Sequence, residues 1–283
     1  MIDVDDLKMK IVAGLSEIGY RPDTFVKESF KRALEKEDSE IACDVLKHLI
    51  ENCEIAEAGN FPLCQDTGIV VFWVKVGNKV VLGDVNLNNI INEAVEEAYR
   101  INNFRHSVVQ DPVNRVNTQT NTPAIIHYEF VEGDEFEVSM MMKGGGSENM
   151  SALKMLTPSD GINGIRAFVL ETVRNAGSNA CPPLIVGIGI GGNFETCALL
   201  AKKSLFRAHD ERNKDEFWAK EEEYLLNEIN NLGIGALGMG GKTTAFRVHI
   251  EVAPCHIASL PVAVNLECHA SRYHKFTLSS RRG

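Results

Sequence analysis

The sequence has no apolar run approaching the roughly 18 residues that a membrane-spanning helix needs. Its N-terminus, MIDVDDLKMK, begins with acidic residues and lacks the basic flank and apolar stretch of a signal peptide. Positive charge is also scarce, because 29 Lys and Arg stand against 39 Asp and Glu, a formal net charge of −10. These absences argue against a membrane, secretion or nucleic acid as the main partner. We expect a cytoplasmic protein in which an anionic ligand needs a local cationic site.

The seven cysteines form no C-x-x-C motif, so local spacing reveals no metal site. Their odd number, without an export signal, indicates reduced thiols used for metal ligation, catalysis or packing. Cys43, Cys53 and Cys197 fall within helical patterns and are predicted to be buried apolar side chains, while Cys255 is ambiguous. The other three share a position at the boundary of a strand or helix, among turn-forming or polar residues. They are Cys64, Cys181 and Cys268.

A thiolate at such a boundary can point into a cavity rather than into the core. The three boundary cysteines lie far apart along the chain. The pattern of the residues therefore allows two interpretations, one shared metal centre or a coincidence of three loop positions.

The chain shows no internal repeat, low-complexity tract or linker, which favours one domain over residues 1–283. Residues 1 to about 58 have helical patterns, with Asp23 and Ser39 placed to cap two helices. A mixed β-sheet region packed with helices should follow, which makes an α+β fold. Its predicted elements are a strand over residues 69–77, helices over 88–103, 161–177 and 193–205, a buried strand over 182–192, a solvated helix within 207–230 and two strands flanking Cys255 and His256.

Two local predictions concern the middle of the chain. Residues 124–143 are interpreted as a β-hairpin that ends at a run of three glycines. Ser147 then stands where it could cap a short helix over ENMSALKML.

Two glycine-rich segments imitate nucleotide-binding motifs. Gly187, Gly189 and Gly192 fit G-x-G-x-x-G, but the segment that follows is too charged for the next buried parallel strand. The run GALGMGGKTT resembles a P-loop, yet Ala236 stands where the leading glycine belongs. The sequence favours a tight turn and an amide-rich loop over sites for a dinucleotide or a nucleoside triphosphate.

Six segments carry a more specific signal through their order along the chain. They are NFPLCQDTGI, FRHSVVQDPVNRVNTQTNTPA, MMKGGGSENMSALKML, NACPPLIVGIGIGGNFETC, GIGALGMGGKTTAF and APCHIASLPVAVNLECHASR. Together they resemble the class I fumarate hydratases and the related L(+)-tartrate dehydratases, from about residue 20 to 275. In this family three cysteines bind a [4Fe-4S] cluster, and the matching positions are Cys64, Cys181 and Cys268. The resemblance thus selects the same three cysteines as their local surroundings do.

The resemblance implies a hydro-lyase in which one iron of the cluster has no protein ligand and acts as a Lewis acid. Gln65 and Asp66 match substrate-site positions, and Asp66 could position or deprotonate the reacting water. The structural alternative for Asp66 is an Asx-turn with Thr67 and Gly68. Arg105 is the first candidate for the substrate's remaining carboxylate, with a surface ion pair as its alternative.

Three further positions follow from the resemblance. The amides of Gly144 and Gly145 could bind a carboxylate as a nest, or could form a simple loop. His256, in APCHIA, matches a position that the family uses at the substrate, although a lone histidine is more often structural.

Single-chain class I enzymes carry a further C-terminal domain with more substrate contacts, and this sequence ends without it. We therefore expect an alpha subunit, inactive by itself, that a separate beta subunit of roughly 200 residues completes. A dimer of alpha-beta pairs is the expected assembly. The base that transfers the proton is expected on the beta subunit.

The predicted reaction is the reversible hydration of fumarate to malate, a step of the tricarboxylic acid cycle. An L(+)-tartrate dehydratase alpha subunit is the nearest alternative, because both activities share these motifs. A non-catalytic iron-sulfur sensor and a structural zinc site are alternatives of other kinds.

Overall fold

The structure, a computed structural model, describes residues 2–59 and 61–279. Contacts between residues divide the chain into two compact units. The first unit comprises Met1–Asp23, Cys53–Gly144 and Arg272–Gly283, and the second comprises Thr24–Asn52 and Gly145–Ser271. Each unit has a four-stranded sheet that mixes parallel and antiparallel pairs, with helices packed against it. This is the α+β class that the sequence predicted.

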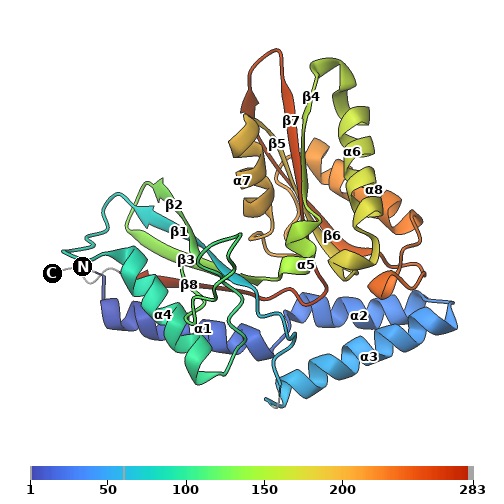
Figure 1. The fold of residues 1–283 in the computed structure, drawn as a ribbon. Helices are drawn as coiled ribbons and strands as arrows, with labels where there is room; N and C mark the ends of the chain where they lie inside the picture. Colours follow the sequence, from blue (N-terminus) through green and yellow to red (C-terminus); the bar gives the residue numbers. More distant parts are fainter. Residues whose placement is uncertain (1, 60, 280–283) are drawn as a thin grey trace. The chain divides into compact units, whose positions relative to one another are not determined.

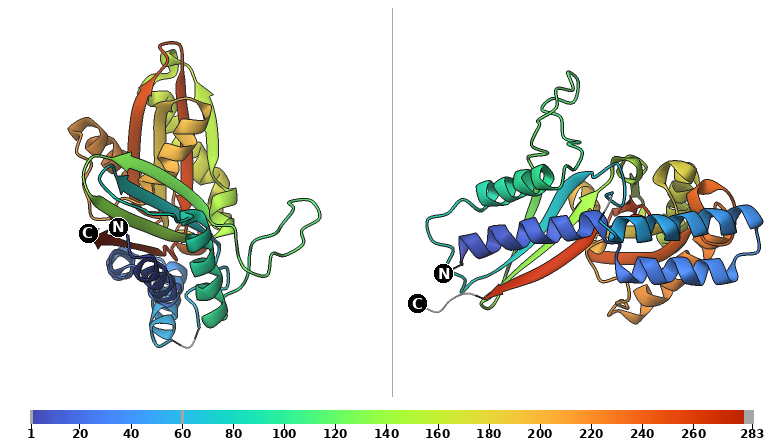
Figure 2. Two further views of the ribbon diagram at one scale, coloured as in Figure 1. Left: turned by 90° about the vertical axis from the view of Figure 1, so that its left-hand side faces the viewer. Right: turned by 90° about the horizontal axis from the view of Figure 1, so that it is seen from below.

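The first unit has two helices on one face of its sheet. Its elements are α1 (Val4–Tyr20), β1 (Ile69–Gly77), α4 (Leu87–Ile101), β2 (Ile125–Val131), β3 (Glu135–Lys143) and β8 (Tyr273–Ser279). The strand order is β2-β1-β3-β8, in which β1 runs parallel to β2 and antiparallel to β3. Helices α1 and α4 pack against each other beneath the sheet (Figures 1 and 2).

The core of this unit follows from the periodicity of its sequence. Every second residue of β1, from Val70 to Val76, is buried against the two helices. Because side chains alternate between the faces of a strand, this pattern commits one whole side of β1 to the core. On α1, Leu7, Ile11 and Leu15 recur at helical spacing and are fully buried in the same core.

The second unit has helices on both faces of its sheet. Its elements are α2 (Thr24–Lys36), α3 (Glu40–Glu57, of which residues 40–52 belong to this unit), α5 (Gly145–Asn149), β4 (Ala152–Leu156), α6 (Gly161–Ala176), β5 (Leu184–Gly192), α7 (Phe194–Ser204), α8 (Glu216–Asn231), β6 (Ala245–Cys255) and β7 (Leu260–Glu267). The strand order is β4-β7-β5-β6, with β5 parallel to β6. Figure 1 shows α7 on one side of β5 and β7, and α6 and α8 on the other.

The N-terminal prediction of helices is confirmed, since α1, α2 and α3 fill most of the first 58 residues. Ser39 caps α3, because its Oγ accepts a hydrogen bond from the Ala42 amide at 3.4 Å. Gly177 ends α6 with a positive φ of 49°, which a residue without a side chain adopts easily. Within the described residues, none of the helices combines the length and apolarity needed to cross a bilayer.

Two predictions for the middle of the chain were wrong. Residues 124–143 do not form a hairpin, because β1 lies between β2 and β3 and pairs with both. The segment ENMSALKML is not a helix, because α5 ends at Asn149 and the residues that follow form β4, paired with β7. In both cases the partner strand comes from a distant part of the sequence. Local patterns therefore could not identify it, and tertiary pairing outweighed a weak helical tendency.

The glycines that imitate a dinucleotide fingerprint have a packing role. A Cβ added at Gly187 or Gly189 would overlap the backbone of α7, at Ala201 and Cys197 respectively. Helix α7 therefore rests directly on the backbone of β5, which only glycine permits at these positions. This contact accounts for the two glycines without any bound nucleotide.

We expect Gly189→Ala to destabilise the protein strongly. The added methyl group must push α7 away from β5, and overpacking of this kind costs roughly 1–3 kcal/mol or more. Thermal unfolding measures the effect, with Leu199→Ala as the control, since Leu199 lies on the same helix with 36% of its surface exposed. Equal losses of stability in the two variants would contradict the close contact between α7 and β5.

Candidate functional site

The first unit carries Cys64, Gln65 and Asp66 on the loop that leads into β1. Oδ1 of Asp66 accepts hydrogen bonds from the Gly68 amide at 2.9 Å and from the Ser107 hydroxyl at 3.3 Å. The first of these is the Asx-turn that the sequence offered as the structural alternative. It occupies only Oδ1, and Oδ2 lies 3.4 Å from the position that a Cβ on Gly144 would take. Asp66 is thus fixed in orientation by one oxygen and directs the other toward Gly144.

Three buried side chains hold the backbone carbonyls of this loop. Arg272 Nη1 donates to the carbonyl of Asp66 at 2.8 Å, and the Tyr99 hydroxyl donates to that of Thr67 at 2.8 Å. Asn121 Nδ2 donates to the carbonyl of Gly68 at 3.1 Å. We call Arg272, Tyr99 and Asn121 the carbonyl clamp. All three are at most 1% exposed.

The electrostatics of the clamp keep its phenol in the donor form. Burial raises the pKa of Tyr99 far above its ordinary value, and this exceeds the opposing effect of the nearby Arg272 guanidinium. Tyr99 therefore stays protonated at any physiological pH and can donate its hydrogen bond to the loop.

Arg105 and Gln65 are exposed, so both side chains are accessible to a ligand. The carbonyl of Arg105 accepts a hydrogen bond from the Thr67 hydroxyl at 2.7 Å. This bond ties the start of the long loop after α4 to the loop of Asp66. The structure thus brings Gln65, Asp66, Gly144 and the backbone of Arg105 together in one unit.

The second unit brings two of the boundary cysteines together. The carbonyl of Cys181 accepts a hydrogen bond from the amide of His269 at 3.2 Å, and His269 Nδ1 lies 3.0 Å from the same oxygen. Cys268, only 9% exposed, immediately precedes His269 at the end of β7. Cys181 has left-handed dihedral angles (φ 53°, ψ 63°), which are uncommon for a residue with a side chain and are typical of functional positions.

Gly145 and Gly146, the two glycines of the run that belong to the second unit, lie near the same turn. Gly145 begins α5, and α5 packs on the 3-10 turn Gly177–Ala180 that precedes Cys181. A Cβ on Gly146 would lie 3.2 Å from the carbonyl oxygen of Asn179.

The donor chemistry of the three boundary cysteines fits an iron-sulfur cluster. None of the seven cysteines forms a disulfide, and Cys64 and Cys181 are half-buried. Cys64 belongs to the first unit, whereas Cys181 and Cys268 belong to the second. Across residues 2–59 and 61–279, no three His, Cys, Asp or Glu side chains are arranged as a metal site.

His256 lies elsewhere in the second unit. It is exposed in the turn between β6 and β7, where its Nδ1 accepts a hydrogen bond from the Ala258 amide at 3.1 Å. The eight residues of β7 separate this turn from Cys268, and an extended strand of that length spans roughly 26 Å. The His256 side chain therefore does not reach a group bound at Cys268 of the same unit.

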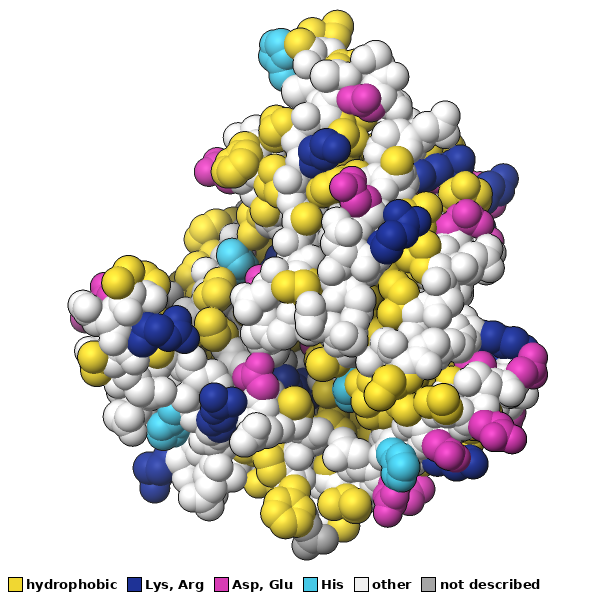
Figure 3. Space-filling view, turned by 45° about the vertical axis from the view of Figure 1, so that its right-hand side comes forward, with side chains coloured by type: hydrophobic (Ala, Val, Ile, Leu, Met, Phe, Trp, Pro, Cys, Tyr) yellow, Lys and Arg dark blue, Asp and Glu magenta, His cyan; other side chains and the backbone are white. Residues whose placement is uncertain are grey.

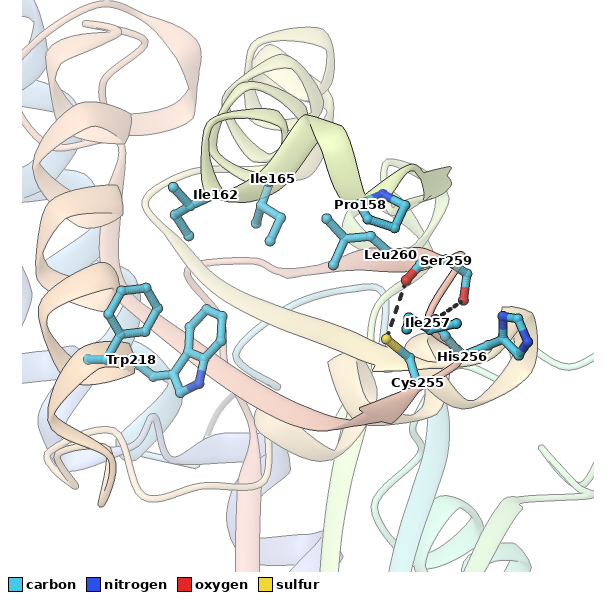
Figure 4. Close-up of a pocket in the computed structure, with 11 residues that line it drawn as sticks. Pro158, Ile162, Ile165, Trp218, Cys255, His256, Ile257, Ser259 and Leu260 are labelled. Atoms are coloured by element: carbon cyan, nitrogen blue, oxygen red, sulfur yellow. Dashed lines mark hydrogen bonds between the residues drawn. The ribbon is translucent and has the colours of Figure 1, made fainter.

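His256 borders a groove of about 400 Å³ instead. Figure 4 shows Ile162, Ile165 and Trp218 across this groove from Cys255 and His256. The thiol of Cys255 donates to the carbonyl of Ser259 at 3.3 Å, which leaves it a role in the turn rather than in a metal site.

Charged side chains of both signs are interspersed on the face drawn in Figure 3, rather than gathered by sign. The Arg272 guanidinium is a buried positive charge beside Asp66, because its Nη1 donates to the Asp66 carbonyl. The sequence identified Arg105 but missed Arg272, Tyr99 and Asn121. Arg272 was contained in the segment CHASR, four residues after Cys268, and its burial is the feature that a sequence does not reveal.

Comparisons with known proteins agree on one family. The family model described as fumarate hydratase (Fumerase) matches residues 9–277. The putative L(+)-tartrate dehydratase subunit alpha of Methanocaldococcus jannaschii is 47% identical over 253 residues, covering 87% of this chain and 88% of that protein. The L(+)-tartrate dehydratase subunit alpha of Escherichia coli K12 is 36% identical over 255 residues, covering 89% and 83% respectively.

Proposed function

This chain belongs to the fumarate hydratase (Fumerase) family, and from that premise we propose that it is the cluster-binding alpha subunit of a hydro-lyase that hydrates fumarate to malate. The family match covers nearly the whole chain and supports a hydro-lyase. The observation that carries the site is the loop of Cys64 and Asp66, where a proposed ligand, a fixed carboxylate and the glycine of the MMKGGG segment meet.

In this proposal Cys64, Cys181 and Cys268 hold a [4Fe-4S] cluster. Three thiolates leave one iron without a protein ligand, and the cluster thereby supplies a Lewis acid without any redox change. The hydrogen bonds between Cys181 and His269 support this set, because they keep two of the three cysteines on neighbouring loops. Outer-shell contacts of this kind orient the ligands of metal sites.

The other residues of the site bind and orient the substrate. Asp66 directs Oδ2 toward the space beside Gly144, where it can accept a proton or a hydrogen bond from the reacting water or hydroxyl. The exposed guanidinium of Arg105 suits a carboxylate of the substrate, because its planar fork matches two carboxylate oxygens. Gln65 and the amides of Gly144 and Gly145 are the remaining candidates for polar contacts.

A separate beta subunit completes the site, and two alpha-beta pairs form the assembly. The curated relatives are named as alpha subunits, which supports a partner chain. The position of His256 supports a second copy, because this side chain does not reach Cys268 of its own unit. We therefore assign His256 to the substrate site of a neighbouring alpha subunit in the assembled enzyme. We propose that this enzyme acts in the cytoplasm.

L(+)-tartrate is the second candidate substrate. The relatives from Methanocaldococcus jannaschii and Escherichia coli carry that name, whereas the family model is named for fumarate hydratase. Both reactions remove or add water at a hydroxy-dicarboxylate, so the same cysteines and the same Asp66 serve either one.

Turnover by the anaerobically reconstituted alpha-beta assembly tests this proposal. We expect activity with fumarate and malate, at a kcat/KM at least about tenfold above that with L(+)-tartrate, and no turnover by the alpha chain alone. A reversed preference would replace fumarate by tartrate. Inactivity of the cluster-loaded assembly on every dicarboxylate would favour a sensor of oxygen or iron. The response of such a sensor should tolerate changes at Gln65, Asp66 and Arg105. Zinc in place of iron and sulfide would favour a structural site.

A further inference from the structure

Arg272 has an unusual environment for a cationic side chain. It is 1% exposed and is the largest fully buried side chain among the described residues. Its Nη1 donates to the carbonyl of Asp66, but its Nε and Nη2 have no hydrogen-bond partner among the described residues. A buried guanidinium with most of its donors unused is unfavourable for stability. Such a violation of packing rules is expected where a residue serves function rather than folding.

The position of the guanidinium links it to the proposed site. A Cβ on Gly144 would lie 3.7 Å from Arg272 Nη2 and 3.4 Å from Asp66 Oδ2. The guanidinium nitrogen Nη2 and the carboxylate oxygen Oδ2 therefore approach the same point. The backbone of Arg272 is fixed as well, because its carbonyl accepts a hydrogen bond from the Met142 amide at 3.1 Å.

The rest of the carbonyl clamp extends this arrangement along the loop. Arg272, Tyr99 and Asn121 bind three successive carbonyls, those of residues 66, 67 and 68, and they come from three separate segments of the chain. Asn121 is itself fixed, since its Oδ1 accepts the amide of Ser107 at 2.6 Å. Each carbonyl of the turn thus has a buried donor, which leaves the backbone that carries Asp66 little freedom to rotate.

We propose that Arg272 is a positioning residue, which with Tyr99 and Asn121 fixes the orientation of Asp66 in the hydro-lyase site. Its hydrogen bond holds the Asp66 carbonyl, and its charge lies beside the space that Oδ2 faces. This role rests on the proposed function, because Asp66 is a site residue only if that function holds. Preorganisation of a reacting group by fixed neighbours is what such a clamp provides.

The test compares Arg272→Met with wild type in the anaerobic alpha-beta assembly. Methionine keeps an unbranched apolar stem, lacks the guanidinium group and donates no hydrogen bond. We expect amide hydrogen exchange in residues 64–68 to become about tenfold faster, because the loop opens more readily. We also expect kcat to fall roughly 10- to 100-fold, as for other outer-shell residues, with KM changed less than about threefold. Arg272→Lys should recover part of both losses, since it keeps a charged donor.

The matched control is Arg166→Met, which removes an arginine bonded through Nε and Nη2 to Glu221. It should alter neither the exchange of residues 64–68 nor kcat. If Arg272→Met does not assemble, Tyr99→Phe carries the test, because it removes only the hydroxyl that binds the Thr67 carbonyl. The same local increase in exchange is expected there.

Three results would overturn the positioning role. They are unchanged exchange and kcat in the clamp variant tested, a large rise in KM at unchanged kcat, and equal effects in Arg166→Met. The exchange measurement does not depend on turnover. An assembly inactive on every dicarboxylate would therefore remove the proposed function, while the exchange comparison would still decide whether Arg272 holds the loop.

Discussion

Replacing Cys268 by serine should abolish both the cluster and the activity of the assembled enzyme. A hydroxyl is a poor ligand for iron beside a thiolate, so the iron and sulfide content of the alpha subunit should fall to background. A Lewis acid contributes several kcal/mol to such reactions, so we expect turnover to fall by roughly 10³-fold or more. Iron and sulfide analysis, with the anaerobic rate of fumarate hydration, measures both effects. Cys64→Ser and Cys181→Ser should behave in the same way.

Cys43→Ser is the matched control for these three variants. Like Cys64 and Cys181, Cys43 is half-buried and free of a disulfide, but it lies on α3, where its thiol donates to the carbonyl of Glu37 at 3.7 Å. The control should keep the iron content and kcat of the wild type. An active, iron-loaded Cys268→Ser assembly would remove Cys268 from the proposed ligand set.

Asp66→Asn should lower kcat by about 10²-fold or more while the cluster remains bound. Asparagine keeps an oxygen that can accept the Gly68 amide and the Ser107 hydroxyl, so the Asx-turn should persist. The substitution therefore removes mainly the charge and the proton-accepting oxygen that faces Gly144. Steady-state kinetics and iron analysis of the same preparation separate this effect from loss of the cluster.

Asp111→Asn tests whether the same change in another Asx-turn of the first unit also lowers kcat. Asp111 accepts the amides of Val113 and Asn114 at 2.9 and 2.6 Å, in the long loop after α4. It has no assigned role at the substrate, so this variant should have the kcat of the wild type. A fully active Asp66→Asn enzyme would show that Asp66 has only a structural role, in the Asx-turn with Gly68.

Local signals predicted the elements whose causes are local. The strand over residues 69–77 matched β1, because glycines stand at both ends of a run that is apolar except for Lys75. The cap at Ser39 and the stop at Gly177 depend on neighbouring residues alone. Strand β2 pairs with β1, and β4 pairs with β7, so each has a partner far away in the sequence. For that reason the hairpin and the helix predicted there were wrong.

The candidate site likewise has features that the sequence reveals and features that only the fold reveals. The boundary positions of the cysteines, and the proximity of Gln65 and Asp66 to Cys64, are properties of the sequence. The importance of Arg272 is not, since arginine is usually exposed and only the fold reveals its burial and its bond to the Asp66 carbonyl. Likewise, the distance between His256 and Cys268 follows from the extended conformation of β7.

Mössbauer spectroscopy of the ⁵⁷Fe-enriched alpha-beta assembly, purified without oxygen, tests the central claim most directly. With one cluster on Cys64, Cys181 and Cys268, the alpha subunit should contain about four iron and four sulfide ions. One iron should differ from the others, and its signal should shift when fumarate or malate is added. Protein without iron, or iron whose signals do not respond to either compound, would contradict the account.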